Sequence, residues 1–233
     1  LGTPTQDRSQ VIVGSPVICF INPNSTESMT NTCRDTLDRV VVTDDTRFEF
    51  ITNRGAPEAI QGAEHGKLAT EAMLSLVANF PGGYAAYVVG CFDDTGVWDL
   101  INQVGRPVIG IGQAAYHWAS LRSQRFVVLT TLAVSIPVIR ESIQRQGFES
   151  CCLDVVASGI PVLELERDPE ESLRILNKCI RAIVDKHGRE VAIILGCAGM
   201  TDFYSELASE WDRSTIIDPV AAGLRLSSVL CHG

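Results

Sequence analysis

The sequence lacks the features that are typical of membrane proteins, of secreted proteins and of nucleic-acid-binding proteins. Its 233 residues contain no run near the roughly 18 consecutive apolar residues of a membrane helix. Residues 1–15 lack the basic and then apolar order of a secretory signal, so we expect a cytoplasmic protein with a flexible tail there. The 28 acidic residues outnumber the 19 basic ones, and no basic stripe is present. We therefore expect neither a membrane nor a nucleic acid as a partner.

Spacings typical of metal sites are also missing. The four histidines are scattered and none of the eight cysteines forms a C-x-x-C pair, so we expect no metal. An even number of cysteines suits disulfides in a short secreted protein. This chain is long and 45% hydrophobic, so it can bury a core without such cross-links, and we expect reduced thiols.

What the chain does contain is a regular alternation of short apolar runs and helical stretches. Aliphatic and β-branched runs of this kind are typical of strands buried on both faces of a parallel sheet. The expected strands are residues 17–21, 48–51, 85–89, 108–111, 125–129, 153–156, 191–195 and 214–217. The expected helices are residues 24–39, 64–79, 113–123, 137–146, 169–186, 202–210 and 220–230. The alternation predicts an α/β fold with right-handed crossovers.

Three of these strands recur along the chain at a nearly constant distance. The runs that begin at residues 17, 85 and 108 have counterparts that begin at residues 125, 191 and 214. Unless this is chance, it predicts two similar parallel-sheet domains related by a pseudo-twofold axis, with the active site in the cleft between them. We expect the last strand and helix to return to the first domain, which would comprise residues 16–112 and 214–233, with residues 113–213 as the second domain. Such folds are often oligomeric, so we expect a homo-oligomer.

A Gly-Cys pair follows two of the repeated strands. Gly90-Cys91 and Gly196-Cys197 each lie just past the carboxyl end of a strand, where open α/β sheets bind ligands. The glycine would let the backbone turn sharply and approach a ligand closely. The helix that follows offers free N–H groups and partial positive charge, which favour a thiolate, so we expect a lowered thiol pKa.

Two equivalent thiols that face one cleft suit the inversion of a carbon acid. One thiolate removes a proton from one face, and the opposite thiol supplies a proton to the other face. Both protonation states are accessible because the reference pKa of a thiol lies near working pH. The enolate oxygen formed on the way needs hydrogen-bond donors. The equivalent strand ends carry Asn24, Ser25, Thr130 and Thr131, which could supply them.

These residues resemble the Asp/Glu/hydantoin racemase superfamily, and within it the hydantoin and allantoin racemase branch, over residues 17–230. The motifs that carry the resemblance are Ile21-Asn22-Pro23-Asn24-Ser25, Cys91-Phe92-x-Asp94-x-Gly96, Gly110-Ile111 through Ala114-Ala115 to His117, Arg125-Phe126 with Thr130-Thr131, and Leu195-Gly196-Cys197-x-Gly199-Met200. The resemblance implies two α/β domains, the two cysteines as bases and no cofactor. The implied substrate is a small molecule, a 5-substituted hydantoin or allantoin. Phe92 and loop amides at Ala198 and Gly199 would help to hold its ring.

Comparison with sister branches narrows the implied substrate. Glutamate racemases carry Asn-Thr after the first cysteine and Thr-His after the second. Here Phe92-Asp93 and Ala198-Gly199 stand in those places, which argues against an amino-acid substrate. Gln61 and Gln113 occupy positions where acids are expected in the hydantoin and allantoin branch, and as neutral amides they could line the pocket.

Other interpretations of the two cysteines stay open. Either one taken alone could be a buried structural thiol. A lone nucleophilic cysteine would need a histidine partner, and His117 is available for that role. A decarboxylase or cis–trans isomerase of the same superfamily would use a single cysteine. A protein that only binds a metabolite would need no reactive thiol.

Overall fold

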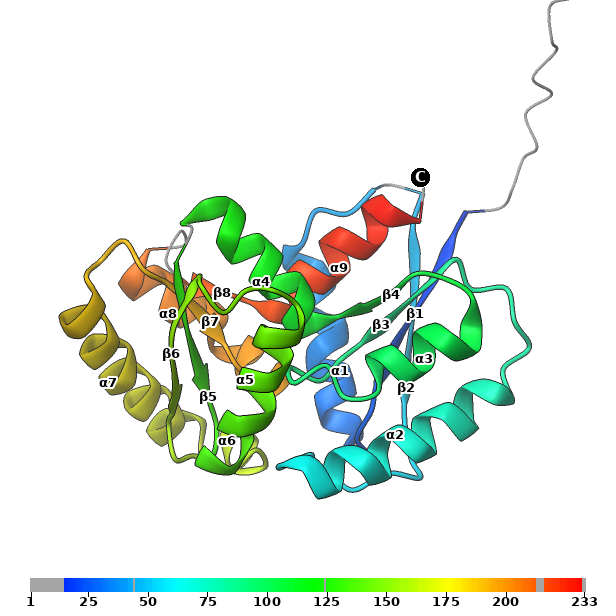
Figure 1. Cartoon of the computed structure of the whole chain (residues 1–233), viewed down its shortest axis with the longest axis horizontal. Helices are drawn as coiled ribbons and strands as arrows, with labels where there is room; N and C mark the ends of the chain where they lie inside the picture. The colour runs from blue at the N-terminus through cyan, green and yellow to red at the C-terminus, as the bar shows by residue number, and fades with distance from the viewer. Residues whose placement is uncertain (1–14, 44, 124, 213–215, 232–233) are drawn as a thin grey trace, which may run out of the picture.

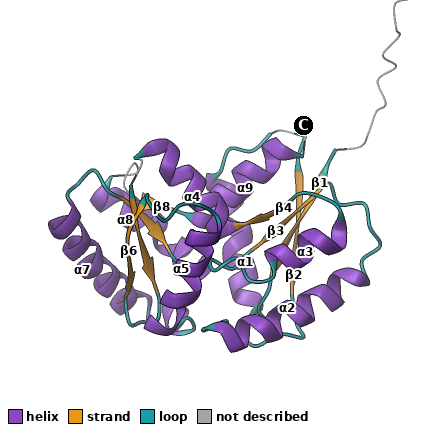
Figure 2. Ribbon diagram, viewed as in Figure 1, coloured by secondary structure: helices purple, strands orange, loops and turns teal. Residues whose placement is uncertain are grey.

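Within the described residues, 15–43, 45–123, 125–212 and 216–231 of this computed structural model, two parallel four-stranded sheets form the framework (Figures 1 and 2). The first sheet has the order β2-β1-β3-β4, with β1 (Val17–Asn22), β2 (Arg47–Thr52), β3 (Ala86–Val89) and β4 (Val108–Gly110). The second has the order β6-β5-β7-β8, with β5 (Phe126–Thr130), β6 (Cys152–Ala157), β7 (Ala192–Leu195) and β8 (Ile216–Ile217). The matching orders confirm the predicted fold of two similar parallel-sheet α/β halves.

Helices cover both faces of each sheet, as the continuous apolar strands require. On β1, for example, Ile18 and Phe20 pack into one core cluster, while Cys19 and Ile21 pack into another on the opposite face. The helices are α1 (Glu27–Asp35), η1 (Thr36–Arg39), α2 (Ala63–Ala78), α3 (Val97–Val104), α4 (Ile111–Arg122), η2 (Ala133–Ser135), α5 (Ile136–Arg145), α6 (Glu164–Arg167), α7 (Pro169–His187), η3 (Ala198–Phe203), α8 (Tyr204–Trp211) and α9 (Pro219–Leu230).

The helices that follow the two edge strands are exchanged between the halves. Helix α9 follows β8 of the second sheet, yet Val220 and Leu224 pack in the core cluster of the first sheet. Helix α4 follows β4 of the first sheet, yet Tyr116 and Ala119 pack in a cluster with residues of β5 and β7. The two helices also pack against each other (Figure 1). The sheets are therefore joined through two reciprocal crossovers.

This exchange corrects one expectation from the sequence. The last helix does return to the first half, but the last strand does not, because Ile216 and Ile217 pair with Ile193 and Ile194 of β7. The pairing satisfies backbone groups that would otherwise be left open along the edge of β7. The domain boundaries themselves remain a prediction. Residues 214–215 of the expected strand, and the expected tail except Ser15, lie outside the described residues.

The observed helices differ from the expected ones mainly where the chain forms short helical segments. The helix expected from Asn24 begins at Glu27 and continues after α1 as the 3₁₀ turn η1. Helix α3 was not predicted; it is eight residues long and lies between Gly96 and Gly105, which both adopt left-handed conformations. The four-residue α6 was not predicted either. No helix in the described part of the chain is both long and apolar enough to span a bilayer.

Candidate active site

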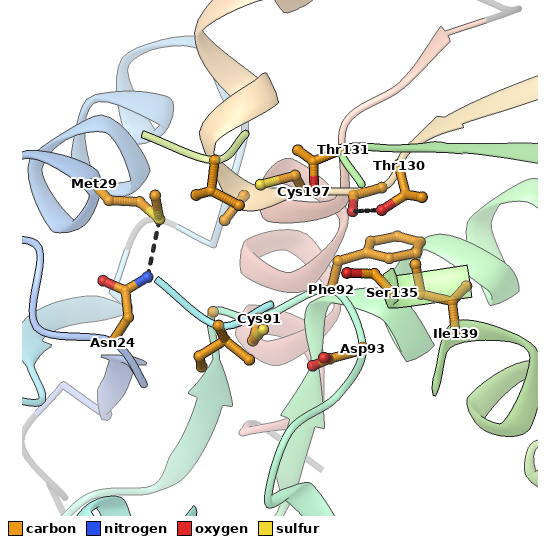
Figure 3. Close-up of a pocket in the computed structure, with 15 residues that line it drawn as sticks. Asn24, Met29, Cys91, Phe92, Asp93, Thr130, Thr131, Ser135, Ile139 and Cys197 are labelled. Carbon is orange, nitrogen blue, oxygen red and sulfur yellow. Dashed lines mark hydrogen bonds between the residues drawn. The ribbon is translucent and has the colours of Figure 1, made fainter. Parts of the chain in front are cut away.

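Cys91 and Cys197 line one pocket, with an empty volume of about 430 Å³, although they belong to different halves. Each follows the carboxyl end of the corresponding strand, β3 or β7. Figure 3 shows the two cysteines on opposite sides of the pocket. Both residues are partly exposed. The other lining residues are Asn24, Met29, Ile60, Gly90, Phe92, Asp93, Thr130, Thr131, Ser135, Ile139, Val162, Gly196 and Ala198.

The glycine before each cysteine is needed because the backbone lies against the central strand of its sheet. A Cβ on Gly90 would lie 2.5 Å from the ring of Phe20, and the Gly90 amide donates to the Ile21 carbonyl at 2.8 Å. A Cβ on Gly196 would lie 2.8 Å from a Val128 methyl group. Neither glycine has a positive φ. Close packing, rather than the sharp turn expected from the sequence, therefore explains the repeated Gly-Cys.

The electrostatic setting of Cys91 favours the neutral thiol. Burial is the main cause that raises its pKa, and the neighbouring carboxylate of Asp93 raises it further. The Thr95 hydroxyl donates to the Cys91 sulfur at 3.7 Å and opposes this rise. The expected helix terminus is too far away to help, since α3 begins only at Val97. The expectation of a lowered pKa is thus wrong for this thiol.

Backbone amides oppose the pKa rise at Cys197, but its surroundings also favour the neutral thiol. Burial raises its pKa to about 11. The amide N–H groups of Gly199 and Met200, at the start of η3, act in the opposite direction because they hydrogen-bond to the sulfur. Here the helix terminus does lie at the thiol, as expected, yet desolvation outweighs it. The two thiols therefore differ in their partners and agree in the direction of the pKa shift.

Most of the predicted substrate-binding residues line the pocket. Asn24, Phe92, Thr130, Thr131 and Ala198 do so. The Thr130 hydroxyl donates to the Gly196 carbonyl at 3.2 Å, so it supports the strand end that carries Cys197. Among the described residues, the side-chain nitrogen of Asn24 donates only to the Met29 sulfur, a weak acceptor, at 3.1 Å.

Two predicted residues do not line the pocket. The Ser25 amide donates to the Pro57 carbonyl at 3.0 Å, and this residue lies outside the pocket lining. Gly199 also lies outside the lining, and its N–H faces the Cys197 sulfur instead. Neither position therefore meets the pocket directly. Gly199 acts on the site through the thiol that it hydrogen-bonds.

Several pocket residues were not predicted from the sequence. Asp93 was quoted beside Cys91 without a role, yet it places a carboxylate in the pocket. Its Oδ1 accepts from the Thr95 amide at 3.1 Å and from the Thr95 hydroxyl. Ser135 comes from the turn before α5. The apolar wall was missed as well, and it consists of Met29, Ile60, Ile139 and Val162.

The histidine and glutamines singled out in the sequence lie outside the pocket lining. His117 is exposed on α4, where its Nδ1 lies 2.9 Å from the Gln113 carbonyl oxygen and its ring packs against Phe148. Gln61 is partly buried. A nucleophilic Cys–His pair is therefore not formed by His117. In the described residues, no group of three or more Cys, His, Asp or Glu is arranged to hold a metal ion.

Known proteins resemble this chain over nearly its whole length. The family model described as Asp/Glu/hydantoin racemase matches residues 18–227. A hydantoin racemase of Rhizobium meliloti is 36% identical over 217 residues, 91% of this chain and 88% of that protein. A hydantoin racemase of Paenarthrobacter aurescens is 30% identical over 215 residues, 91% of this chain and 90% of that protein. The structure of an allantoin racemase from Klebsiella pneumoniae has a TM-score of 0.85 at 29% identity, covering 94% of this chain and 88% of that one.

The chain belongs to the Asp/Glu/hydantoin racemase family. This confirms the resemblance that the motifs indicated. The relatives also confirm that the protein is an isomerase of the racemase class.

Proposed function

We propose that this protein racemises a cyclic ureide, a 5-substituted hydantoin or allantoin, by a two-base proton transfer between Cys91 and Cys197. The observation that carries the proposal is the position of one thiol from each half on opposite sides of a single pocket. Inversion of a carbon acid needs a proton acceptor on one face and a proton donor on the other. The reaction then requires no metal and no organic cofactor.

The raised pKa values fit this chemistry. A base with a higher pKa binds the substrate proton more strongly, although a smaller fraction of it is ionised at neutral pH. In the active form one sulfur is a thiolate and the other a thiol. The thiolate removes the ring C–H proton, and the opposite thiol donates its proton to the other face of the resulting enolate. After turnover the two sulfurs have exchanged protonation states, so the same pair catalyses the reverse direction.

The charge of the pocket supports a neutral ring substrate. Among the described lining residues there is one carboxylate, Asp93, and no lysine, arginine or histidine. A substrate carboxylate would therefore meet a like charge and find no cation to pair with. A ureide ring instead offers N–H donors, and since the Thr95 contacts use Asp93 Oδ1, Oδ2 is the oxygen that would accept one. This favours a ureide over an amino acid or a malonate.

Donors for the enolate oxygen are also at hand. The hydroxyls of Thr131 and Ser135 lie in the pocket lining, and neither has a hydrogen-bond partner among the described residues. The Asn24 amide can exchange its weak sulfur acceptor for an oxyanion. Such donors stabilise the charge that develops during proton removal. The apolar wall of Met29, Ile60, Ile139 and Val162 then excludes water around the ring.

The test compares three serine variants by racemisation and by exchange of the ring C–H in deuterated water, each with single enantiomers. Cys91→Ser and Cys197→Ser should each lose racemisation by at least about 100-fold, because each removes one of the two proton-transfer groups. Cys179→Ser is the matched control, since this partly buried thiol lies on α7, away from the pocket lining. Unchanged racemisation in either pocket variant would refute the two-base scheme.

A substrate panel tests the assignment of the ureide separately. Hydantoins with different 5-substituents, allantoin, free amino acids and arylmalonates should be followed by polarimetry and by carbon dioxide release. Loss of optical rotation is expected with one or more ureides only. Release of carbon dioxide from a malonate, or racemisation of an amino acid alone, would overturn the assignment.

A further inference from the structure

A second cavity lies outside the thiol pocket and shares no lining residue with it. Its empty volume is about 760 Å³. It is formed where the exchanged helices α4 and α9 meet η1, α8 and β8. The lining residues are Arg39, Trp118, Arg122, Tyr204, Ile216, Ile217, Asp218, Ala221 and Arg225. Neither the motifs nor the racemase chemistry accounts for it.

The charge of this cavity is opposite to that of the chain as a whole. Three arginines line it in a protein whose net charge is −9. The single carboxylate in the lining, Asp218, is already paired with Arg39 at 2.5 Å. Arg122 and Arg225 form no ion pair with any described residue. The cavity therefore keeps two positive charges that no described side chain neutralises.

Aromatic rings orient the guanidinium groups. The Arg225 guanidinium carbon lies 5.4 Å from the ring centre of Trp118, and that of Arg39 lies 5.6 Å from the ring centre of Tyr204. Such stacking restricts a flexible side chain and leaves the N–H edge of the guanidinium free to donate. The Arg39 Nε is buried and has no hydrogen-bond partner among the described residues. A donor of this kind is costly to leave without an acceptor.

We propose that this cavity binds a small organic anion that carries carboxylate or phosphate groups. The guanidinium fork matches both groups, because each presents two oxygens in one plane. Arg122 and Arg225 would bind the anion from the two exchanged helices, α4 and α9. Trp118 and Tyr204 would cover its apolar part. The proposal does not depend on the substrate of the thiol pocket.

The bound anion would also contact Arg39, which is hydrogen-bonded to the short helix that follows Cys197. Arg39 donates to the Thr201 hydroxyl at 2.6 Å, and Thr201 donates to Asp218 at 2.6 Å. Thr201 belongs to η3, the same short helix whose first amides hydrogen-bond to the Cys197 sulfur. Neighbouring residues of η3 thus contact Arg39 of the cavity and act on the Cys197 sulfur.

The test is calorimetric titration of the whole protein with citrate and, in a second arm, with glycerol phosphate. Sodium chloride keeps the ionic strength constant. We expect saturable binding of at least one probe, and the two arms tell carboxylate from phosphate. The double variant Arg122→Gln/Arg225→Gln should weaken binding by at least about tenfold. Arg225→Lys keeps the charge but loses the fork, so it should weaken binding by a smaller factor.

Arg174→Gln is the matched control, since Arg174 is an exposed arginine on α7 that is absent from the cavity lining. It should bind the probe as the unaltered protein does. Circular dichroism checks that each variant is folded. Absence of saturable binding to both probes, or equal affinity in the double variant and the unaltered protein, would overturn the proposal.

Discussion

The exchanged helices α4 and α9 each begin at a buried aspartate carboxylate, but the two carboxylates come from different places in their halves. In the second half Asp218 is the residue just before α9, and its Oδ1 accepts from the Val220 and Ala221 amides at 2.9 and 3.2 Å. Its Oδ2 accepts from Arg39 at 2.5 Å. One residue therefore caps the helix and carries a countercharge.

In the first half the corresponding place before α4 is Gly110, and the carboxylate is supplied by Asp94, three positions after Cys91. Its Oδ1 accepts from the Gly112 and Gln113 amides at 3.0 and 3.2 Å. Its Oδ2 accepts from Ser142 and Gln146 of the second half, at 3.1 and 2.7 Å. The same cap is thus built from the loop that carries Cys91, and its hydrogen-bond partners are all neutral.

The difference shows how similar halves acquire different electrostatics. Burial raises the pKa of Asp94 to about 7, although its hydrogen bonds with Gln146, Gln113 and Ser142 oppose the rise. Asp218 performs the same capping beside a guanidinium. The repeated fold therefore determines where a carboxylate is needed. The neighbouring side chains determine how strongly burial disfavours its charged form.

The largest expected effect concerns the pH dependence of stability. The folded-state pKa of Asp94 is raised, so native protein holds a proton that unfolded protein loses above pH 4. Stability from this group should fall by about 1.4 kcal/mol per pH unit between about pH 4 and pH 7, and stay level above that. The advantage of the unaltered protein over Asp94→Asn should shrink across this window in urea titrations. A constant difference from pH 4 to pH 8 would contradict the prediction.

The next largest effect should follow Gly110→Ala. The added Cβ would overlap the Asp94 carboxylate, which would lose its bonds to the start of α4. We expect a loss of about 3 kcal/mol in the free energy of unfolding. Gly55→Ala is the control, because its Cβ would meet its nearest neighbour at 3.7 Å, an ordinary contact. Equal stability of the two variants would show that the first half does not depend on the capping of α4 by Asp94.

A smaller effect is expected when the countercharge in the second half is lost. Asp218→Asn keeps an oxygen for the α9 amides but breaks the ion pair with Arg39. The Asp218 side chain is 1% exposed and that of Arg39 is 28% exposed, so water takes over part of the interaction. We expect a loss of about 2 kcal/mol. Thermal unfolding of the variant and the unaltered protein at one pH would check this loss, and equal midpoints would contradict it.

The smallest effect separates the two thiols. Asp93 acts on the pKa of both cysteines, but it is a leading cause for Cys91 and the last one for Cys197. Asp93→Asn should therefore speed alkylation of Cys91 by iodoacetamide several-fold and that of Cys197 less. The measurement uses Cys197→Ser and Cys91→Ser backgrounds so that one pocket thiol is followed at a time. A larger change at Cys197 would reverse the assigned order.

The sequence predicted the features that depend on local pattern. Apolar runs marked the strands, and the repeated Gly-Cys marked the strand ends at which the pocket forms. Features that depend on distant packing were not predictable. The raised pKa of both thiols needs knowledge of what buries them, and the bond between Asp94 and Gln146 joins residues of different halves. The pairing of the two-residue β8 was missed for the same reason.

The exchange of α4 and α9 affects the order in which the two halves can fold during synthesis on the ribosome. One face of the first sheet is completed by α9, which is translated after the entire second half. The N-terminal half therefore emerges with an apolar surface that only the last described helix can cover. Nascent chains halted before residue 219 should bind chaperones that recognise exposed apolar segments, and release from them should coincide with synthesis of α9.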